Sequence, residues 1–419
     1  MNHKTAIVGF GCAGYHGAKA LRKHGYQGEI DVYTDTLWAP ANPMLTTYYV
    51  GGKLDKEGTL PFGRPEDIAK RYDLKIGEER VKKLISEERK LLFESGETKV
   101  YDQILISTGA LPFMPSIPGI FCKNVFPMRT MEDAEQLKVV LENEKIQHAV
   151  VVGASMVGIK MVELFHMRGI KCTLVDMASV IFPVSAVPIV AHEIERRLKH
   201  VGVEFMFGKS LREIREMNGK RQVVFSDGGS IACEVVMMCI GTRANTKIVD
   251  DDIHINRGIV VDSTMKTNIP GIYAAGDCCE GINLMTGETQ TIGIWDNAAR
   301  QGETAGANMA GKHTIYQGNI LHNITHFMGM DFISYGDVRA VGDDYFYENK
   351  EKRQMFFVRV NNRKPVCMNF IDSYGASGVL KAYMLRKLDG SREGLSSIER
   401  VRMIKEGIPE PMIDCLMKI

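Results

Sequence analysis

One short pattern occurs twice in this chain, and the repeat limits the possible folds more than any other feature. An apolar run, a glycine-rich turn and a stretch with helical periodicity occupy residues 4–24 and again residues 148–169. A short apolar run is typical of a strand buried in a parallel sheet, and the helix that follows covers one face of that sheet. The repeat therefore predicts two βαβ units and an α/β fold.

The first glycine-rich turn has the spacing GxGxxG and stands directly between a strand and a helix. In a Rossmann-like domain such glycines let the backbone approach a dinucleotide pyrophosphate, which binds at the helix N-terminus. We expect this contact from Gly9, Gly11, Cys12, Ala13 and Gly14. An acidic residue about 20 positions further on binds ribose hydroxyls in such domains, and Asp35 stands there.

The second turn predicts another dinucleotide site, formed by Gly153, Ser155, Met156, Val157 and Gly158. Ser155 replaces the middle glycine, and its small side chain can itself donate to a phosphate. The next strand ends in Asp176, whose carboxylate would accept from ribose hydroxyls and repel a 2′-phosphate. Residues 177–179 contain no arginine to hold that phosphate. The sequence therefore favours NADH over NADPH at this site.

The segments around the two units predict how the domains are divided. Alternating segments at 81–86, 90–94 and 100–107 predict an antiparallel meander that returns to the first sheet. The proline-rich residues 111–118 predict a crossover, because proline removes a donor and restricts the residue before it.

A third domain, of α+β type, is predicted beyond residue 318. Strands at 355–360 and 366–371 precede a helix at 376–386. The complete prediction is two Rossmann-like three-layer domains and a C-terminal α+β interface domain, at 1–115 with 246–318, at 116–245 and at 319–419.

The composition excludes several classes of protein. Hydrophobic residues make up 45% and charged residues 25%, as in ordinary globular domains. Lys and Arg total 52 against 51 Asp and Glu, so no net field favours nucleic acid as a partner. The sequence contains no apolar run of about 18 residues, which is the length that would predict a membrane span. The N-terminus has no signal-peptide pattern, and the nine cysteines show no CxxC pair. We therefore expect reduced thiols in a cytoplasmic protein. We expect no metal site, since His322 and His326 lack a third ligand.

Together with both turns, three further segments resemble the FAD-dependent pyridine nucleotide-disulfide oxidoreductase superfamily. These are residues 106–110 (ISTGA), 236–245 and 272–277 (IYAAGD). The resemblance covers roughly residues 4–315 and points to the ferredoxin or rubredoxin reductase and coenzyme A-disulfide reductase or NADH oxidase branches. It implies FAD in the first domain and NAD(H) in the second. The further FAD contacts that it implies are Asn42, Val81, Thr108, Gly109, Arg129, Gly276, Asp277 and Trp295, and Gly241 is implied for NAD.

Some of these residues carry a specific role in the family. By the resemblance, Arg129 would reach the FAD pyrophosphate, Val81 would lie against the adenine and Trp295 beside the isoalloxazine. The alternative for Trp295 is an aromatic side chain in the core.

The departures from the family pattern bear on the chemistry. Pro43 stands where the disulfide-reducing branch has its redox-active cysteine, and no CxxxxC pair exists. Thr36 rather than Asp35 takes the usual Glu position in the register of the ferredoxin reductases. Lys160 replaces a Glu near the nicotinamide, and the alternative for it is an exposed helix lysine. Cys12 and the pair Cys278-Cys279 are interpreted as packing rather than redox residues.

The sequence thus predicts an FAD-dependent NAD(P)H oxidoreductase. Hydride would pass from NADH to FAD, and electrons would then pass to a redox protein, a quinone, dioxygen or a small organic molecule. The alternatives are an FAD- and NADH-binding signalling or assembly protein with slow turnover, or a divergent NADH oxidase or disulfide reductase. The third domain predicts a homodimer, with an intramolecular cap on the FAD domain as its alternative.

Overall fold

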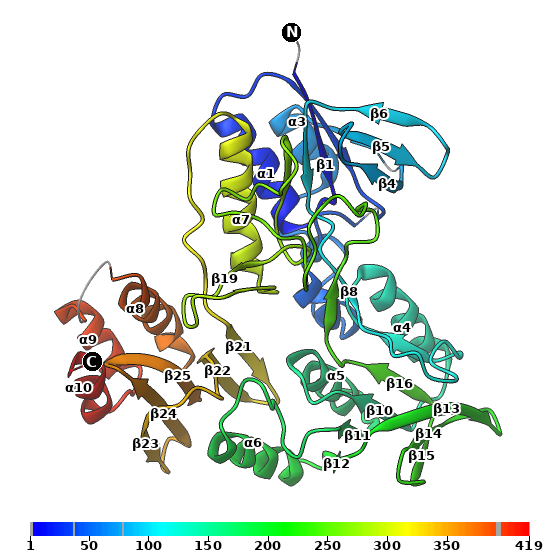
Figure 1. Cartoon of the computed structure of the whole chain (residues 1–419). Coiled ribbons are helices and arrows are strands. Elements are labelled where there is room, and N and C mark those ends of the chain that lie inside the picture. The colour runs from blue at the N-terminus through cyan, green and yellow to red at the C-terminus, as the bar shows by residue number, and fades with distance from the viewer. Residues whose placement is uncertain (1–2, 37, 78, 391–394, 419) are drawn as a thin grey trace.

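The computed structural model of the protein describes residues 3–36, 38–77, 79–390 and 395–418. Figure 1 shows three groups of elements, with β1 in the upper group, β10 at the lower right and β22 at the lower left. Within the described residues, no helix is long and apolar enough to cross a membrane.

The first sheet has five parallel strands, which explains why its strands are continuous apolar runs. Its order is β18 (Ile272–Ala274), β7 (Gln103–Ile106), β1 (Lys4–Val8), β2 (Glu29–Tyr33) and β3 (Lys75–Gly77). The helices of this group are α1 (Cys12–Lys23), α3 (Pro65–Tyr72) and α7 (Trp295–Met309), whereas the short helix α2 (Thr46–Val50) packs against the second group. Residues distant in sequence thus complete one sheet, because β18 pairs with β7.

Helices α1 and α7 approach each other so closely that glycine is required between them. A Cβ on Gly302 would lie 2.3 Å from the carbonyl oxygen of Ala13, and a Cβ on Gly306 would lie 2.3 Å from that of Gly17. No side chain fits at such distances. This contact fixes the start of α7 beside the first glycine-rich turn.

The meander is present, but its last segment is not one strand as predicted. It consists of β4 (Val81–Ile85), β5 (Lys90–Phe93) and β6 (Thr98–Val100). The chain then leaves this sheet at Tyr101 and enters β7 of the parallel sheet. The buried Tyr101 hydroxyl donates to Asp31 at 2.8 Å, which fixes the change of sheet. A short hairpin, β19 (Gly281–Ile282) and β20 (Thr289–Gln290), follows β18.

The second sheet repeats the architecture of the first. Its parallel order is β12 (Glu204–Phe207), β11 (Lys171–Asp176), β10 (His148–Val152), β16 (Val235–Met238) and β9 (Val125–Pro127). Its helices are α4 (Met131–Asn143), α5 (Met156–Met167) and α6 (Pro188–His200). An antiparallel sheet of β13 (Leu211–Met217), β14 (Lys220–Phe225) and β15 (Ser230–Cys233) precedes β16. The two predicted Rossmann-like units are therefore confirmed.

Two short antiparallel strands connect the two parallel sheets. They are β8 (Ala110–Pro112) and β17 (Thr242–Ala244). The Thr108 hydroxyl donates to the Asn245 carbonyl at 2.6 Å, and the Asn245 N–H donates to the Gly109 carbonyl at 2.9 Å. The predicted crossover at 111–118 therefore begins as a strand of this connection.

The third group is an antiparallel sheet with helices, as predicted. The order is β21 (His322–Phe327), β22 (Met330–Gly336), β25 (Lys364–Ile371), β24 (Gln354–Asn361) and β23 (Asp343–Asn349). The helices are α8 (Ser377–Asp389), α9 (Ser397–Lys405) and α10 (Glu410–Lys418).

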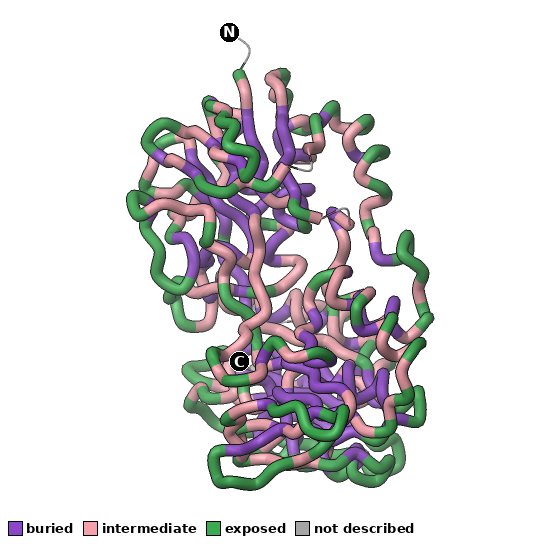
Figure 2. Tube along the Cα trace, turned by 90° about the vertical axis from the view of Figure 1, so that its right-hand side faces the viewer, coloured by how far each residue is buried: buried purple, intermediate pink, exposed green. Residues whose placement is uncertain are grey.

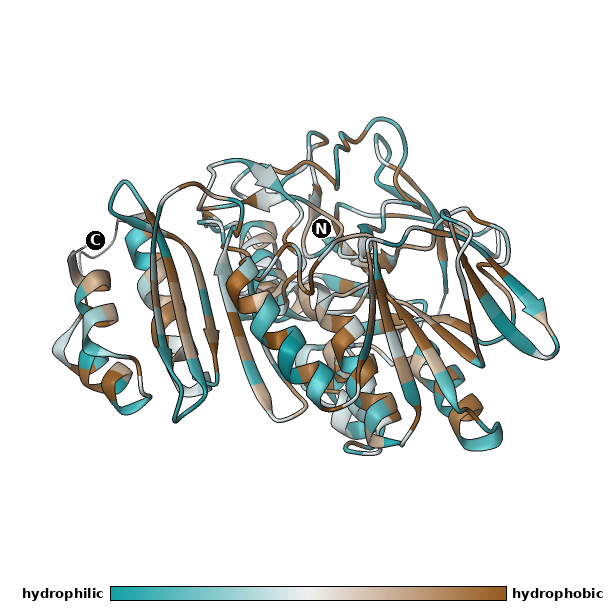
Figure 3. Ribbon diagram, turned by 90° about the horizontal axis from the view of Figure 1, so that it is seen from below, coloured by the Kyte–Doolittle hydropathy of each residue, from teal (hydrophilic) through white to brown (hydrophobic). Residues whose placement is uncertain are grey.

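The strands β22, β25 and β24 of this third sheet are buried on both faces within the chain, whereas the edge strand β23 is exposed. Side chains on successive residues point to opposite faces, so Phe332 packs toward the second sheet while Ile333 packs toward α8–α10. Phe332 stacks on Phe182 of the second group with ring centroids 5.2 Å apart. Figure 2 shows buried residues gathered in the interior and exposed residues at the periphery, and Figure 3 shows hydrophobic residues on both strands and helices. The third group therefore packs against the second group.

Candidate cofactor and electron-transfer site

A cavity of about 440 Å³ opens where the three groups meet. Nine of the predicted FAD contacts line it, namely Gly11, Cys12, Ala13, Asn42, Gly109, Arg129, Gly276, Asp277 and Trp295. The second group contributes Met156, Val157 and Lys160, and the third contributes residues 322–325. Other predicted residues do not line this cavity, namely Gly9, Gly14, Asp35, Val81, Thr108, Gly153, Ser155, Gly158, Asp176 and Gly241.

The three glycines of the first turn have different physical roles. Gly9 has φ +97°, and a Cβ there would lie 2.3 Å from the Ser107 carbonyl oxygen. A Cβ on Gly14 would lie 2.2 Å from the Gly9 carbonyl oxygen. At Gly11, by contrast, a Cβ would meet nothing within 4 Å. Two glycines thus serve internal packing, and Gly11 leaves open space at the N-terminus of α1. This cradle fits the pyrophosphate of a dinucleotide.

Arg129 and Asp277 form an ion pair at the cavity wall. The Arg129 Nη2 donates to Asp277 Oδ2 at 2.6 Å, and both side chains are at least three-quarters buried. Arg129 directly precedes a capping box, in which the Thr130 hydroxyl and Asp133 satisfy the first turn of α4. The α4 N-terminus therefore holds a guanidinium in the cavity, next to the Gly276-Asp277 turn.

An aromatic stack borders the other end of the cavity. Trp295 opens α7 and stacks on Phe62, with centroids 5.7 Å apart and an interplanar angle of 19°. Phe62 stacks in turn on Tyr15, with centroids 3.9 Å apart. Trp295 is half-buried and faces the cavity, so it is not simply a core residue. Sequence reasoning missed Phe62, because no motif links residue 62 to residue 295.

The cysteines near the cavity are buried and hydrogen-bonded within the protein. Burial, followed by the Asp277 charge, raises the pKa of Cys12 to about 12. The Cys278 thiol donates to the Ile106 carbonyl at 3.4 Å, whereas the Cys279 thiol donates to the Gly276 carbonyl. Both are buried. Burial raises the pKa of Cys279, whereas the hydrogen bond with Cys279 lowers the pKa of Cys278. These contacts fit the packing role predicted for all three residues.

The second turn is built like the first. A Cβ on Gly153, with φ +110°, would lie 2.3 Å from the Cys239 carbonyl oxygen, and a Cβ on Gly158 would lie 2.0 Å from that of Gly153. The Ser155 hydroxyl accepts from the Gly158 N–H at 3.1 Å and donates to the Cys239 carbonyl at 2.8 Å. The proton that we expected Ser155 to offer to a phosphate is therefore engaged within the protein.

Asp176 lies at the carboxyl end of β11 and contacts this turn. Its Oδ2 accepts from the Ala154 N–H at 2.6 Å, and its Oδ1 accepts from the Ala178 N–H at 2.8 Å. The carboxylate is thereby held at the edge of the sheet where dinucleotide ribose binds in such folds.

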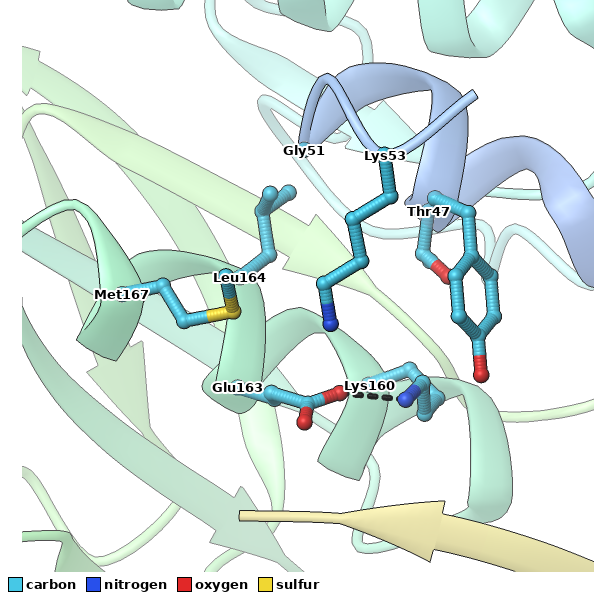
Figure 4. Close-up of a pocket in the computed structure, with 8 residues that line it drawn as sticks. Thr47, Gly51, Lys53, Lys160, Glu163, Leu164 and Met167 are labelled. Carbon is cyan, nitrogen blue, oxygen red and sulfur yellow. Dashed lines mark hydrogen bonds and ion pairs between the residues drawn. The ribbon is translucent and has the colours of Figure 1, made fainter. Parts of the chain in front are cut away.

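Lys160 joins the second and third groups. Its Nζ pairs with Glu163, donates to the His326 carbonyl at 2.8 Å and lies 4.8 Å from the Tyr48 ring centroid. Figure 4 shows this pair and Lys53, which points down toward Glu163 from the chain segment above. Lys160 is therefore neither an exposed helix lysine nor free to act in the cavity alone.

Glu163 is the partner that sequence reasoning missed. It accepts from the Met328 N–H at 3.0 Å through Oε1. Burial raises the pKa of Glu163, but Lys160 and the Met328 N–H outweigh burial, and the pKa lies below its ordinary value. The i,i+3 spacing of Lys160 and Glu163 was the available signal.

His322 lies on the cavity wall formed by β21, which sequence reasoning did not anticipate. Its Nδ1 lies 3.2 Å from the Ile320 carbonyl oxygen, which can only accept. Burial lowers the pKa of His322 to about 4. His322 is therefore neutral at pH 7, with Nε2 as a hydrogen-bond acceptor. His326 instead pairs with Asp331, and the described residues contain no cluster that could hold a metal ion.

The residues present fit a bound FAD. The open cradle at Gly11, the guanidinium of Arg129 and the aromatic wall at Trp295 occur in one cavity. Pro43, which begins the 3-10 turn Pro43–Leu45, lines the same cavity, and Asn42 caps that turn through the Met44 N–H.

Comparison with known proteins agrees with this geometry. The family model described as pyridine nucleotide-disulphide oxidoreductase matches residues 3–302. The NADH oxidase of Methanocaldococcus jannaschii is 31% identical over 317 residues, which are 74% of this chain and 70% of that protein. The ferredoxin–NAD(+) reductase component of the 3-phenylpropionate/cinnamic acid dioxygenase of Photorhabdus laumondii is 26% identical over 314 residues, covering 74% of this chain and 78% of that protein.

Two solved structures show the same fold. The covalent putidaredoxin reductase–putidaredoxin complex superposes with a TM-score of 0.84 at 21% identity, covering 92% of this chain and 94% of that chain. A water-forming NADH oxidase from Lactobacillus brevis bound to NADH gives 0.83 at 20% identity, covering 92% and 91%. The family model covers well over half of the chain. The chain therefore belongs to the pyridine nucleotide-disulphide oxidoreductase family and is an FAD-dependent NAD(P)H oxidoreductase that passes electrons to a second acceptor.

Proposed function

We propose that this enzyme oxidises NADH in preference to NADPH and reduces a protein or small-molecule acceptor rather than a disulfide. The observation that carries the proposal is Asp176, held by two backbone N–H groups at the end of β11. A fixed carboxylate there accepts from ribose hydroxyls and repels a 2′-phosphate. Residues 177–179 offer no arginine in compensation.

The absence of a usable thiol supports the second half of the proposal. Pro43 lines the cavity where the disulfide-reducing branch has cysteine, and among the described residues that line this cavity only Cys12 carries a thiol. A raised pKa keeps that thiol protonated at pH 7, and a protonated thiol is a poor nucleophile.

We assign the residues as the motifs predict. The FAD contacts proposed are Gly9, Gly11, Cys12, Ala13, Gly14, Asp35, Asn42, Val81, Thr108, Gly109, Arg129, Gly276, Asp277 and Trp295. The NAD contacts proposed are Gly153, Ser155, Met156, Val157, Gly158, Asp176 and Gly241. When bound, FAD supplies the hydride and electron transfer between the nicotinamide and the acceptor.

The chain's own residues would orient that chemistry. The α1 N-terminus and Arg129 place positive charge at the pyrophosphate end of the cavity. Met156 and Val157, at the start of α5, form part of the cavity wall contributed by the second group. Lys160 is bound to Glu163 and His326, so we propose that it holds β21 against the cavity rather than reacting.

We further propose the domain division 1–115 with 246–318, 116–245 and 319–419. It is supported by the three separate sheets and by the β8–β17 connection near residues 110 and 245. A cytoplasmic location remains a proposal, supported by nine cysteines that are all free thiols.

A homodimer through the third domain is also proposed, and α9 is the surface that suits it. The central strands β22, β25 and β24 are buried on both faces within the chain, which leaves the helices and the exposed edge strand β23 for a partner. Helix α9 exposes Ile398, Val401 and Ile404, at 82%, 53% and 40%. Sedimentation of the intact chain at micromolar concentration tests this. A dimer that Val401→Glu dissociates supports it, and a monomeric wild-type chain contradicts it.

The function is tested by anaerobic stopped-flow reduction of the purified holoenzyme. We expect flavin bleaching that is faster with NADH than with NADPH, and FAD rather than FMN on denaturation. A screen of ferredoxin, rubredoxin, quinone, dioxygen and disulfide acceptors then identifies the second substrate. Tight NADH binding with slow turnover toward every acceptor, artificial dyes included, would instead favour the signalling or assembly alternative.

A further inference from the structure

In the second βαβ unit, the acid that follows the second strand contacts the glycine-rich turn. The Gly153 N–H donates to the Val175 carbonyl at 2.7 Å, and the next residue is Asp176. The Asp176 carboxylate accepts from Ala154 in that turn. This is the position from which an acid reaches a dinucleotide ribose.

The first unit has the same backbone geometry without the acid. The Gly9 N–H donates to the Tyr33 carbonyl at 2.8 Å, but the next residue is Thr34. Asp35 follows, and its exposed side chain makes no hydrogen bond or ion pair within the described part of the chain. The structural counterpart of Asp176 is therefore a threonine.

A carboxylate reaches this edge of the first sheet from another element. The Thr36 hydroxyl donates to Glu132 Oε1 at 2.5 Å and accepts from the Trp38 N–H at 3.1 Å. Glu132 lies in the first turn of α4, three residues after Arg129, which lines the cofactor cavity. The second oxygen of Glu132, Oε2, has no hydrogen-bond partner among the described residues and can accept another donor.

We propose that Glu132, oriented by Thr36, is the carboxylate that binds the adenosine ribose hydroxyls of FAD. The inference rests on FAD as the cofactor of the first domain. Thr36 uses the hydroxyl proton to hold Oε1, which leaves Oε2 for a ribose hydroxyl. A purely structural role, in which Glu132 stabilises the positive end of α4, would need neither Thr36 nor a free oxygen.

FAD binding to the apo-protein, followed by quenching of flavin fluorescence, tests the assignment. A second ligand, an FAD analogue whose adenosine ribose lacks the 2′- and 3′-hydroxyls, reports on the hydroxyl contact itself. We expect Glu132→Gln to weaken FAD binding about tenfold, the size of one charge-assisted hydrogen bond. We also expect this variant to bind FAD and the analogue with nearly equal affinity, whereas the wild-type protein prefers FAD.

Matched variants separate this contact from a structural effect. Thr36→Val leaves the carboxylate in place but removes its orienting donor, and should weaken FAD binding severalfold. Glu142→Gln, an exposed glutamate on the same helix, should change nothing. Asp35→Asn tests the motif's own candidate for this contact, which the Glu132 assignment replaces in the ribose role. If Glu132 binds the hydroxyls, the preference for FAD over the analogue persists in this variant.

Two results overturn the assignment. One is a Glu132→Gln protein that still prefers FAD over the analogue as strongly as wild type does, including a protein that loses affinity equally for both ligands, as a structural defect would cause. The other is loss of the preference in Asp35→Asn instead. A wild-type apo-protein that binds no FAD at all would contradict the flavoenzyme assignment itself, which is a different failure.

Discussion

Lys160 on α5 donates from Nζ to the carbonyl oxygen of His326 on β21, 2.8 Å away, and so ties the third domain to the second. The same ammonium pairs with Glu163, whose other oxygen accepts from the Met328 N–H. Both charged side chains are nearly buried, with 13% and 11% exposed. Lys160, at a position where the resemblance implies a glutamate, therefore joins the second and third groups in this chain.

Replacing Lys160 by alanine should destabilise the protein, because it leaves Glu163 buried without its cation. We expect a loss of about 2–3 kcal/mol in the free energy of unfolding, measured by urea denaturation of the holoenzyme. Lys83→Ala on the exposed meander is the control. A loss no larger than that of the control would mean that Lys160 does not hold the domains together.

The ionisation of His322 should make the protein less stable in acid. The pKa of His322 is about 4 in the folded chain, against 6.5 ordinarily. The folded state therefore binds this proton later than the unfolded state, and stability falls as pH drops from about 6.5 toward 4. His322→Asn should flatten that slope in thermal unfolding measured across this range, while a slope identical to wild type would contradict the assignment. The charged groups that act on His322 are Lys381, Asp296 and Arg300.

Asp176→Ala should narrow the preference for NADH. Removal of the carboxylate abolishes both the ribose acceptor and the repulsion of a 2′-phosphate, so the ratio of reduction rates should shift toward NADPH by about tenfold. Stopped-flow reduction with each nucleotide measures it. An unchanged ratio with intact folding would place the selectivity elsewhere.

No cysteine should carry catalytic electrons. Cys12→Ser and Cys278→Ser proteins with full FAD content should reduce their acceptor at near wild-type rates, since burial keeps the Cys12 thiol protonated and Cys278 is buried with its thiol donating to the Ile106 carbonyl. Two-electron titration should show plain flavin bleaching without a thiolate charge-transfer band. Such a band, or inactivation by mild alkylation, would count against this view.

The two glycine-rich turns show what could be predicted from sequence. Gly9 and Gly14 are required because their absent Cβ atoms would meet backbone oxygens, so the requirement is local and visible in the spacing. The apolar runs before each turn likewise follow from burial in a parallel sheet. Both units and the α+β character of the third domain were predicted correctly for this reason.

Other site residues depend on contacts between distant parts of the chain. Phe62 contacts Trp295, Thr36 contacts Glu132, and β21 contacts α5. No periodicity or motif in the sequence predicts any of these pairs. The change of sheet at Tyr101 escaped prediction in the same way, since it depends on the buried Asp31.

The sequence by itself determined the two dinucleotide-binding units, because backbone sterics and strand burial act over a few neighbouring residues. Only the tertiary structure decided how the third domain docks, which groups Lys160 contacts and which acid reaches the first unit. Those outcomes depend on side-chain packing and charge pairing between segments about 100 or more residues apart, such as Thr36 with Glu132 and Lys160 with His326. Long-range contacts of this kind leave no spacing in the sequence from which they can be inferred.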